Sequence, residues 1–211
     1  MTKTTIIYYT HNQEAPRFER KIQKNILDNC GGLPVVSVSH KPIDFGVNIC
    51  VGEQLLSYSN VLRQTLIGLR QAKTEFCIAC EDDCLYPPDY FQFTPPTKDS
   101  VYRYTNIFVH FDGRKRFWKK HYVEAAQMCG RKFWIERIES ILRGHDSWEP
   151  IAVNPPFVFT TADEYSWTGK NPVIYFKTRK SFKFKTGFMP GSMTEVPYWG
   201  TAEAVENRFL K

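Results

Sequence analysis

The chain has 211 residues, of which 42% are hydrophobic and 24% charged, and this composition excludes an intrinsically disordered protein. A chain of this length can bury its own core, so we expect one domain over residues 1–211. No apolar run approaches the roughly 20 residues of a membrane-spanning helix, and the first residues lack the pattern of a signal peptide. We therefore expect a cytoplasmic protein without a membrane partner.

The net charge of +6 is uneven along the chain. Residues 1–100 contain 10 Lys and Arg against 11 Asp and Glu, whereas residues 101–211 contain 18 against 11. The second half therefore carries a charge of +7. This excess predicts an anionic partner such as nucleic acid, a phosphorylated ligand or an acidic polymer.

The first forty residues predict a strand, a helix and a second strand. Residues 4–12, TTIIYYTHN, form a short β-rich run that ends in a polar cluster. The next segment has Pro16 near a helix start, apolar residues at helical spacing, and Gly31 as a stop. Residues 33–39, LPVVSVS, indicate the second strand.

The same order repeats between residues 52 and 80. Leucines recur at helical spacing in residues 52–74, and residues 75–80, EFCIAC, predict a buried strand. Alternating elements of this kind indicate a parallel sheet with crossover helices, which binds ligands at the carboxyl ends of its strands. Two polar clusters follow such ends, at residues 10–12 and 81–83.

The rest of the chain is less regular. Residues 101–111 predict a strand and residues 131–144 a helix. From about residue 145 the chain is rich in loops and prolines and holds only short strand candidates, at 156–160 and 172–176. We predict an α/β fold with a Rossmann-type mixed sheet flanked by helices, in a single domain whose C-terminal part is irregular.

The sequence EDD at residues 81–83 is the clearest chemical signal in the chain. Three carboxylates at the mouth of a buried strand are costly unless something positive lies among them. Glu81 and Asp83 can reach one divalent cation together, and their hard oxygens suit Mg²⁺ or Mn²⁺. A solvated acidic turn, or an ion pair with a nearby Arg, would explain the same residues.

The strand and its acidic motif, with the preceding helix YSNVLRQTLIGLRQA, resemble glycosyltransferases of the GT-A fold over residues 4–144. The resemblance implies a GT-A-like sheet and a nucleotide-sugar donor such as a UDP-sugar. It implies that Glu81 and Asp83 hold Mn²⁺ or Mg²⁺ and that Asp82 orients the ribose or sugar. Such an ion would neutralise the diphosphate leaving group.

The resemblance also assigns donor-binding residues outside the acidic motif. The end of the first strand, at Thr10, His11 and Asn12, matches the place where the family contacts the nucleotide. Asn60 and Arg63 fall on the helix that lines the same pocket.

The C-terminal segments look like the closing segments of small phage and bacterial transferases of this type, on residues 171–188 and on PYWG at 197–200. Those proteins often carry a histidine as a further metal ligand, and Thr178 stands in its place here. Lys177 or Arg179 could bind the nucleotide diphosphate instead.

Two basic segments with aromatic residues lie in the second half. Residues 113–120, GRKRFWKK, and residues 176–185, FKTRKSFKFK, hold five cations each. Cations neutralise phosphates and aromatic faces accept bases or sugar rings, so the segments favour a polyanionic acceptor. A solvated loop and an amphipathic strand would explain them as well. The predicted acceptor contacts are Arg114, Lys115, Arg116, Trp118 and Lys119.

A transferase that inverts its sugar needs a general base near the acceptor hydroxyl, usually a carboxylate. The loop carboxylates in the right part of the chain are Asp146, Glu149, Asp163 and Glu164. Histidines at 11, 110 and 145 could also serve.

Three of the six cysteines, Cys77, Cys80 and Cys84, have a spacing that resembles a thiol metal site. On a strand, however, Cys77 and Cys80 point to opposite faces, and no second cysteine pair completes a tetrahedral site. We expect reduced cysteines that pack in the core.

We therefore expect a metal-dependent glycosyltransferase, either a hexosyl- or a pentosyltransferase. Residues 1–111 would bind the donor, and the basic residues 112–211 would bind the acceptor. The favoured acceptor is a hydroxymethylated base in phage DNA, modified in the bacterial host cytoplasm, and a bacterial surface glycan precursor is the alternative. A non-catalytic nucleic-acid-binding module would leave the acidic motif without a role. A nucleotidyltransferase would usually have a Gly-rich loop, which residues 10–20 lack.

Overall fold

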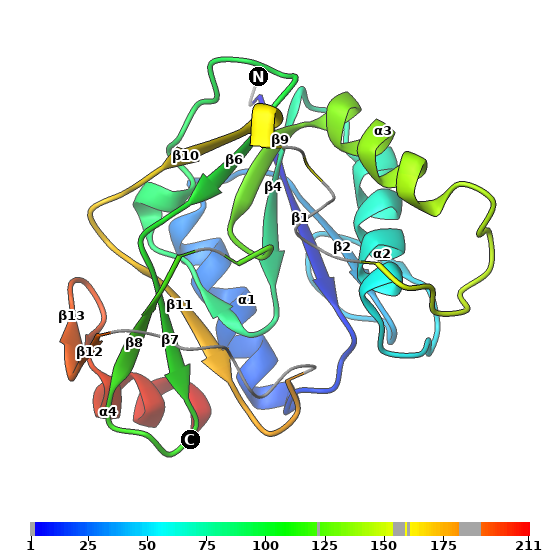
Figure 1. Cartoon of the computed structure of the whole chain (residues 1–211). Helices are drawn as coiled ribbons and strands as arrows, with labels where there is room; N and C mark the ends of the chain where they lie inside the picture. The colour runs from blue at the N-terminus through cyan, green and yellow to red at the C-terminus, as the bar shows by residue number, and fades with distance from the viewer. Residues whose placement is uncertain (1–2, 122, 154–158, 160, 182–190) are drawn as a thin grey trace.

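The computed structural model describes residues 3–121, 123–153, 159, 161–181 and 191–211. Its largest feature is a seven-stranded mixed sheet (Figure 1). The strands lie in the order β10 (Glu164–Trp167), β6 (Val101–Tyr104), β9 (Gln127–Gly130), β4 (Phe76–Glu81), β1 (Thr4–Thr10), β2 (Val35–Ser39) and β3 (Val47–Cys50). Strands β4, β1, β2 and β3 are parallel, and β9 runs antiparallel to both of its neighbours.

Helices cover both faces of this sheet (Figure 1). Helix α1 (Pro16–Asn29) packs on one face, and helices α2 (Tyr58–Gln71) and α3 (Arg131–Leu142) pack on the other. Alternation along the strands divides the core, because Tyr8 and Cys80 enter the cluster under α1, whereas Tyr9 and Cys77 enter the cluster under α2 and α3. The predicted α/β fold with a mixed sheet is thus confirmed.

The predicted helices differ from the observed ones mainly at their first residues. Pro16 opens α1, where its missing N–H costs no hydrogen bond. Helix α2 begins at Tyr58 rather than near residue 52, because the Ser57 side chain caps it by accepting from the Asn60 N–H at 3.1 Å.

The prediction of one strand over residues 101–111 is wrong. The chain leaves the first sheet after β6 and enters a second sheet as β7 (Ile107–Phe111), because Thr105 and Asn106 bond to the backbone of residues 167–170 instead of continuing the ladder. The second sheet has the order β12 (Ser192–Met193), β8 (Phe117–Lys120), β7, β11 (Val173–Lys177) and β5 (Cys84–Leu85).

One of the two strand candidates of the C-terminal part is confirmed. The candidate at 172–176 is found as β11. The candidate at 156–160 lies outside the described residues except for Phe159, which is buried under α2 and α3.

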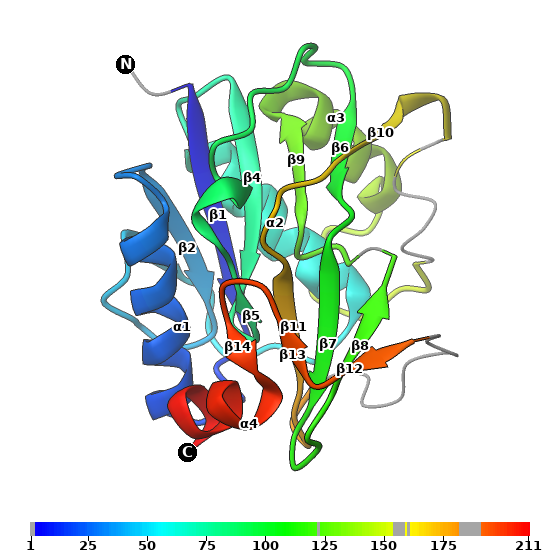
Figure 2. The same ribbon diagram turned by 90° about the vertical axis from the view of Figure 1, so that its left-hand side faces the viewer.

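The last residues pack against α1 (Figure 2). A two-stranded ribbon of β13 (Glu195–Val196) and β14 (Gly200–Thr201) leads into α4 (Ala202–Val205) and a π-helical turn η4 (Glu206–Leu210). Short 3₁₀ turns, η1 (Pro88–Tyr90) and η3 (Thr161–Asp163), precede β6 and β10. In the part of the chain that the structure describes, no helix has both the length and the apolar character needed to cross a membrane.

Candidate active site

The acidic residues 81–83 lie where β4 ends beside β1. The two strands are parallel, and their register places Tyr9 opposite Glu81. After Glu81 the chain turns at once into β5, so Glu81 and Asp83 no longer follow the alternation of a strand. Carboxylate oxygens of Glu81 and Asp83 and the sulfur of Cys84 all lie within 4.8 Å of one another.

Asp82 points to a different partner than its two neighbours. The Thr10 hydroxyl donates to its Oδ2 at 2.5 Å, and the same hydroxyl accepts from the Asn12 N–H at 2.8 Å. The Gln64 side chain fixes the end of β1 from α2, donating to the Thr10 carbonyl at 2.9 Å. The first-strand end and the acidic motif are therefore physically joined, as expected for two neighbouring parallel strands.

The three carboxylates lie close together, with Asp83 buried and Glu81 and Asp82 partly buried. Burial raises the pKa of Glu81 to about 7, and Glu124 adds to this rise, while the Tyr9 hydroxyl, Lys177 and Lys120 oppose it. Burial also raises the pKa of Asp83 well above its ordinary value, with Glu81 and Asp82 as the next causes. The negative charges thus destabilise one another.

Lysines approach this cluster without forming close ion pairs. Lys177, which is 3% exposed, and Lys120 both favour the charged forms of nearby carboxylates. Yet within the described ranges no Lys or Arg nitrogen lies within 4.0 Å of a carboxylate oxygen of residues 81–83. The cluster has room for a further positive charge.

The donor chemistry of the cluster fits Mg²⁺ or Mn²⁺ better than a thiophilic metal. Burial raises the pKa of the Cys84 thiol well above its ordinary value, so it stays protonated and donates to Asp83 Oδ1 at 3.4 Å. Glu81 and Asp83 are left as two hard oxygen ligands. Cys77 and Cys80 are buried on opposite faces of β4, as predicted, and are not part of this set.

A cavity of about 130 Å³ opens beside the three carboxylates. Segments from five parts of the chain form its wall. They are Tyr9, His11, Gln13 and Glu14 after β1; Leu56, Tyr58 and Val61 at the start of α2; residues 81–83; Lys120 and Val123–Ala125 after β8; and Tyr175, Lys180 and Ser181 around the end of β11.

The residues predicted at the end of β1 divide between two roles. His11 lines the cavity, and burial, with the nearby His40, lowers its pKa to about 4, so it is neutral at pH 7. Asn12 has a left-handed backbone, with φ of 52°, and its side chain bonds to Glu19 and to the Lys41 N–H. Asn12 therefore shapes the loop around the cavity.

Asn60 and Arg63 lie away from this cavity. Both side chains are buried, and Arg63 donates to Asn60 Oδ1 at 2.8 Å. Asn60 also donates to the carbonyls of Leu55 and Trp148, and Arg63 donates to the His145 carbonyl. In the structure both side chains hold the loop after α3 against α2, and neither lines the cavity.

The end of β11 meets the loop after β1. The Thr178 hydroxyl donates to Glu14 at 2.5 Å, and the turn at residues 178–181 brings Lys180 to the cavity. Lys177 approaches Glu81 and Asp83, whereas Arg179 is exposed. Thr178 thus ties two cavity segments together.

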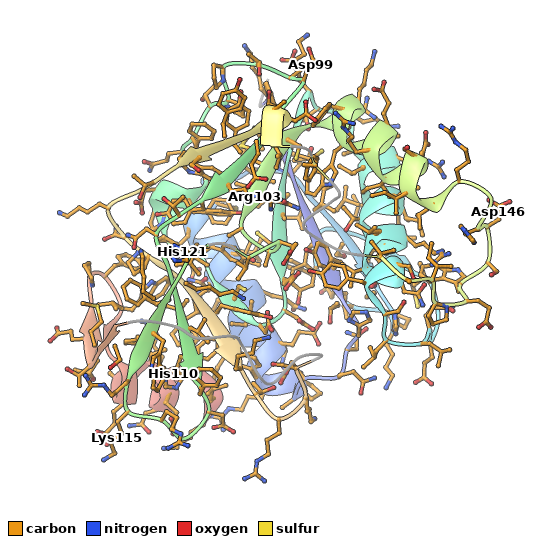
Figure 3. All side chains as sticks on the ribbon, in the orientation of Figure 1. Asp99, Arg103, His110, Lys115, His121 and Asp146 are labelled. Atoms are coloured by element: carbon orange, nitrogen blue, oxygen red, sulfur yellow. The ribbon has the colours of Figure 1, made fainter. Side chains whose placement is uncertain are left out.

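The four predicted general bases lie outside the cavity wall. Asp146 and Glu149 are exposed on the loop after α3, and Figure 3 shows Asp146 at the outer edge of the molecule beyond α2. Asp163 pairs with Arg137, and Glu164 pairs with Arg103 at 2.6 Å.

The position of Glu164 in the sheet separates it further from Glu81. The ladders place Glu164 level with Cys77, three strands away from β4. At ordinary strand geometry this is about 14 Å across the sheet and about 13 Å along it from Glu81.

Glu124 and Glu14 are cavity carboxylates that the sequence did not reveal, and Glu124 is the one whose charge acts on Glu81. Glu124 is half-buried in the connection between β8 and β9. The surrounding sequence HYVEAA carries no motif, so Glu124 is recognised as a site residue only from its position near Glu81 in the folded protein. Lys120 belongs to the basic segment 113–120 that the sequence revealed. Strand alternation places its side chain, with that of Trp118, on the face of β8 opposite to Phe117 and Lys119.

Most of the predicted acceptor contacts are engaged within the protein. Arg116 donates to Ser192, Trp118 packs edge-on against Phe111, and Lys119 bonds to Asn106. Arg114 and Lys115 are exposed in the tight turn between β7 and β8, where Figure 3 labels Lys115. Of the second basic segment, residues 182–185 lie outside the described residues.

Comparisons with known proteins show the fold. No family model and no curated protein matches this chain. Among solved structures, S. aureus TarS 1–349 in complex with UDP-GlcNAc is similar, with a TM-score of 0.53 and 12% identity over 87% of this chain and 60% of that one. A mannosyltransferase, PcManGT from Pyrobaculum calidifontis in complex with GDP-Man and Mn²⁺, gives a TM-score of 0.50 and 14% identity over 85% and 58% of the two chains.

The fold is therefore a GT-A-like α/β fold, the class to which these nucleotide-sugar glycosyltransferases belong. The chain spans less than two thirds of the length of either of the two structures.

Proposed function

We propose that the protein is a metal-dependent glycosyltransferase that moves a hexosyl or pentosyl group from a nucleotide-sugar to an acceptor hydroxyl. The observation that carries the proposal is the pair Glu81 and Asp83, whose oxygens converge at the carboxyl end of β4 beside a cavity. Such strand ends are where α/β sheets bind their ligands.

Each residue of the acidic motif has a distinct task in this proposal. Glu81 and Asp83 would hold Mg²⁺ or Mn²⁺, which neutralises charge on a diphosphate when bound. Asp82, fixed by Thr10, would accept a hydroxyl of the ribose or sugar. Lys177 and Lys180, from the end of β11, would add positive charge for the diphosphate.

Glu124 is the carboxylate that we propose as general base. It faces the same cavity as Glu81, and an acceptor hydroxyl entering there comes within reach of it. Asp146, Glu149, Asp163 and Glu164 are withdrawn from this role because none of them borders the cavity and two of them already neutralise arginines.

For the acceptor we propose a hydroxymethylated base in DNA, with residues 112–211 as the acceptor-binding half. The support is the charge of +7 on residues 101–211 and the exposed Arg114 and Lys115. A surface glycan precursor is the competing acceptor.

Two measurements test the proposal. Titration calorimetry with UDP- and GDP-sugars, with and without Mn²⁺, should show metal-dependent binding that Asp83→Asn abolishes and that Asp163→Asn retains. Incubation with a panel of nucleotide-sugars and hydroxymethylated DNA, followed by digestion and mass spectrometry of nucleosides, should show a sugar mass on the modified base. Absence of any metal-dependent donor binding would end the transferase proposal, whereas donor hydrolysis without nucleoside modification would end only the DNA acceptor.

A further inference from the structure

A second and larger cavity lies between α1 and the C-terminal segment. The ribbons of these two elements are neighbours in Figure 2. Its volume is about 460 Å³, and none of its lining residues borders the cavity at the acidic motif. One wall is the second half of α1 and the other is the ribbon turn and η4. The residues used below are Lys21, Lys24, Asn29, Tyr198, Trp199 and Arg208. We call this cavity the α1 groove.

Tyr198 occupies an unusual backbone conformation at the edge of the α1 groove. The Trp199 N–H bonds to the Pro197 carbonyl at 2.8 Å, which closes a three-residue turn between β13 and β14. Tyr198 at its centre has φ of 69°, a region that strains any residue with a side chain. Glycine would be free of this strain, so the bulky ring at this position is more consistent with a functional role.

The Tyr198 ring is held in place while its surface stays open. Its hydroxyl donates to Asn29 Oδ1 at 3.1 Å, and its ring stands edge-on to Trp199 at 4.6 Å between centroids. Trp199 is fixed in turn by its indole N–H, which donates to the Pro172 carbonyl. Even so, Tyr198 is 53% exposed. The result is an ordered aromatic surface beside a polar groove.

Positive charge runs along the same side of α1. Arg17, Arg20, Lys21 and Lys24 recur at helical spacing and cover about 10 Å of the helix axis. Lys24 pairs with Asp28, but within the described ranges no carboxylate oxygen lies within 4.0 Å of Arg17, Arg20 or Lys21. Arg208 extends the charge across the groove, with its guanidinium over the Phe209 ring.

We propose that the α1 groove binds single-stranded nucleic acid. A line of cations suits a repeating phosphate backbone, and an exposed, fixed aromatic ring suits an unstacked base; the two together distinguish this surface from a simple basic helix. Tyr198 would stack with a base, and Lys21 with Arg20 and Arg208 would contact phosphates. The assignment does not depend on the proposed function, because the two cavities share no residue.

Fluorescence anisotropy with a labelled 20-nucleotide dT strand tests this site. We expect Tyr198→Gly to weaken binding by about 5- to 150-fold, the range for loss of one stacked base. The glycine relieves the backbone strain, which offsets the loss of the bond to Asn29 and of the ring contact with Trp199, so we expect this variant to fold. Tyr198→Phe should retain binding. Lys21→Ala should weaken binding to all sequences and make the salt dependence shallower, whereas Lys132→Ala, an exposed lysine on α3, should change nothing.

Three results would overturn the assignment. They are the absence of dT binding at 50 mM salt, binding that Tyr198→Gly leaves unchanged, and tighter Tyr198-dependent binding of a sulfated oligosaccharide than of dT, which would make the groove a glycan site. Glu81→Gln separates this proposal from the proposed function, because it should lose metal-dependent donor binding and keep dT binding.

Discussion

Replacing Glu81 by Gln should stabilise the metal-free protein while it removes the metal site. The pKa of Glu81 lies at about 7 against an ordinary value of 4.5, chiefly because the carboxyl is buried. At 1.36 kcal/mol for each pKa unit, this difference corresponds to about 3 kcal/mol of destabilisation at pH values above 7. Gln removes the charge and keeps an oxygen for the Tyr9 hydroxyl.

Because burial of the Gln amide still has a cost, we expect a gain of about 1–3 kcal/mol in unfolding free energy for Glu81→Gln in EDTA. For a chain of this size each kcal/mol raises Tm by about 2–4 °C. The pH dependence of the unfolding free energy checks the sign of this effect. The folded pKa exceeds the unfolded one, so the folded state retains the proton longer. The advantage of Gln should be full above pH 7 and vanish as the pH falls towards 4.5.

Thermal unfolding with and without Mn²⁺ measures both effects. Saturating Mn²⁺ at 100 times its Kd should stabilise the wild type by about 2.7 kcal/mol and leave Glu81→Gln unchanged. Glu75→Gln, at the exposed residue just before β4, is the matched control, and Mn²⁺ should raise its Tm by the wild-type amount. The reasoning fails if Glu81→Gln lowers the Tm of the metal-free protein, or if Mn²⁺ still raises its Tm by the wild-type amount.

Three further predictions concern the cavity and its support. Glu124→Gln should lower turnover by about 10²- to 10⁴-fold with donor affinity unchanged, whereas Asp163→Asn should keep turnover; wild-type turnover in Glu124→Gln would remove that residue from catalysis. Asn60→Ala should cost about 2–4 kcal/mol in denaturant unfolding, because it removes the acceptor of the buried Arg63 Nη1 and the donor of two backbone carbonyls, and should not alter donor affinity in calorimetry. Lost donor binding at unchanged stability would restore Asn60 as a donor contact. As the pH falls from 6.5 to 4, the wild type should lose up to about 3 kcal/mol more stability than His11→Phe. The reason is that His11 has a pKa of about 4 in the folded state, so in this pH range it binds a proton only in the unfolded state. Equal pH dependence of the two proteins would contradict the low pKa of His11.

Local signals in the sequence predicted the regular part of the fold. Pro16, the apolar spacing of α1 and α2, and the buried run of β4 each specify an element through neighbours a few residues away. The sequence also placed residues 10–12 and 81–83 at the carboxyl ends of two strands of a parallel sheet. Because these strands are neighbours, Thr10 and Asp82 are joined there at 2.5 Å.

Predictions failed where a contact depends on distant segments. Residues 101–111 alternate like one strand, yet bonds from Thr105 and Asn106 to residues 167–170 direct the two ends into different sheets. Asn60 lies on α2, as predicted, but its side-chain amide donates to the Trp148 carbonyl in the loop after α3.

The sequence by itself determined the α/β class, the place of the acidic motif at a strand end, and the positive charge of the second half, because these depend on local periodicity and composition. Only the tertiary structure decided which charges face residues 81–83. Lys120, Glu124 and Lys177 come from the second half of the chain, and nothing near them in sequence indicates that they meet β4. The physical reason is that a pKa and a binding cavity depend on through-space distance and burial, which local sequence patterns do not encode.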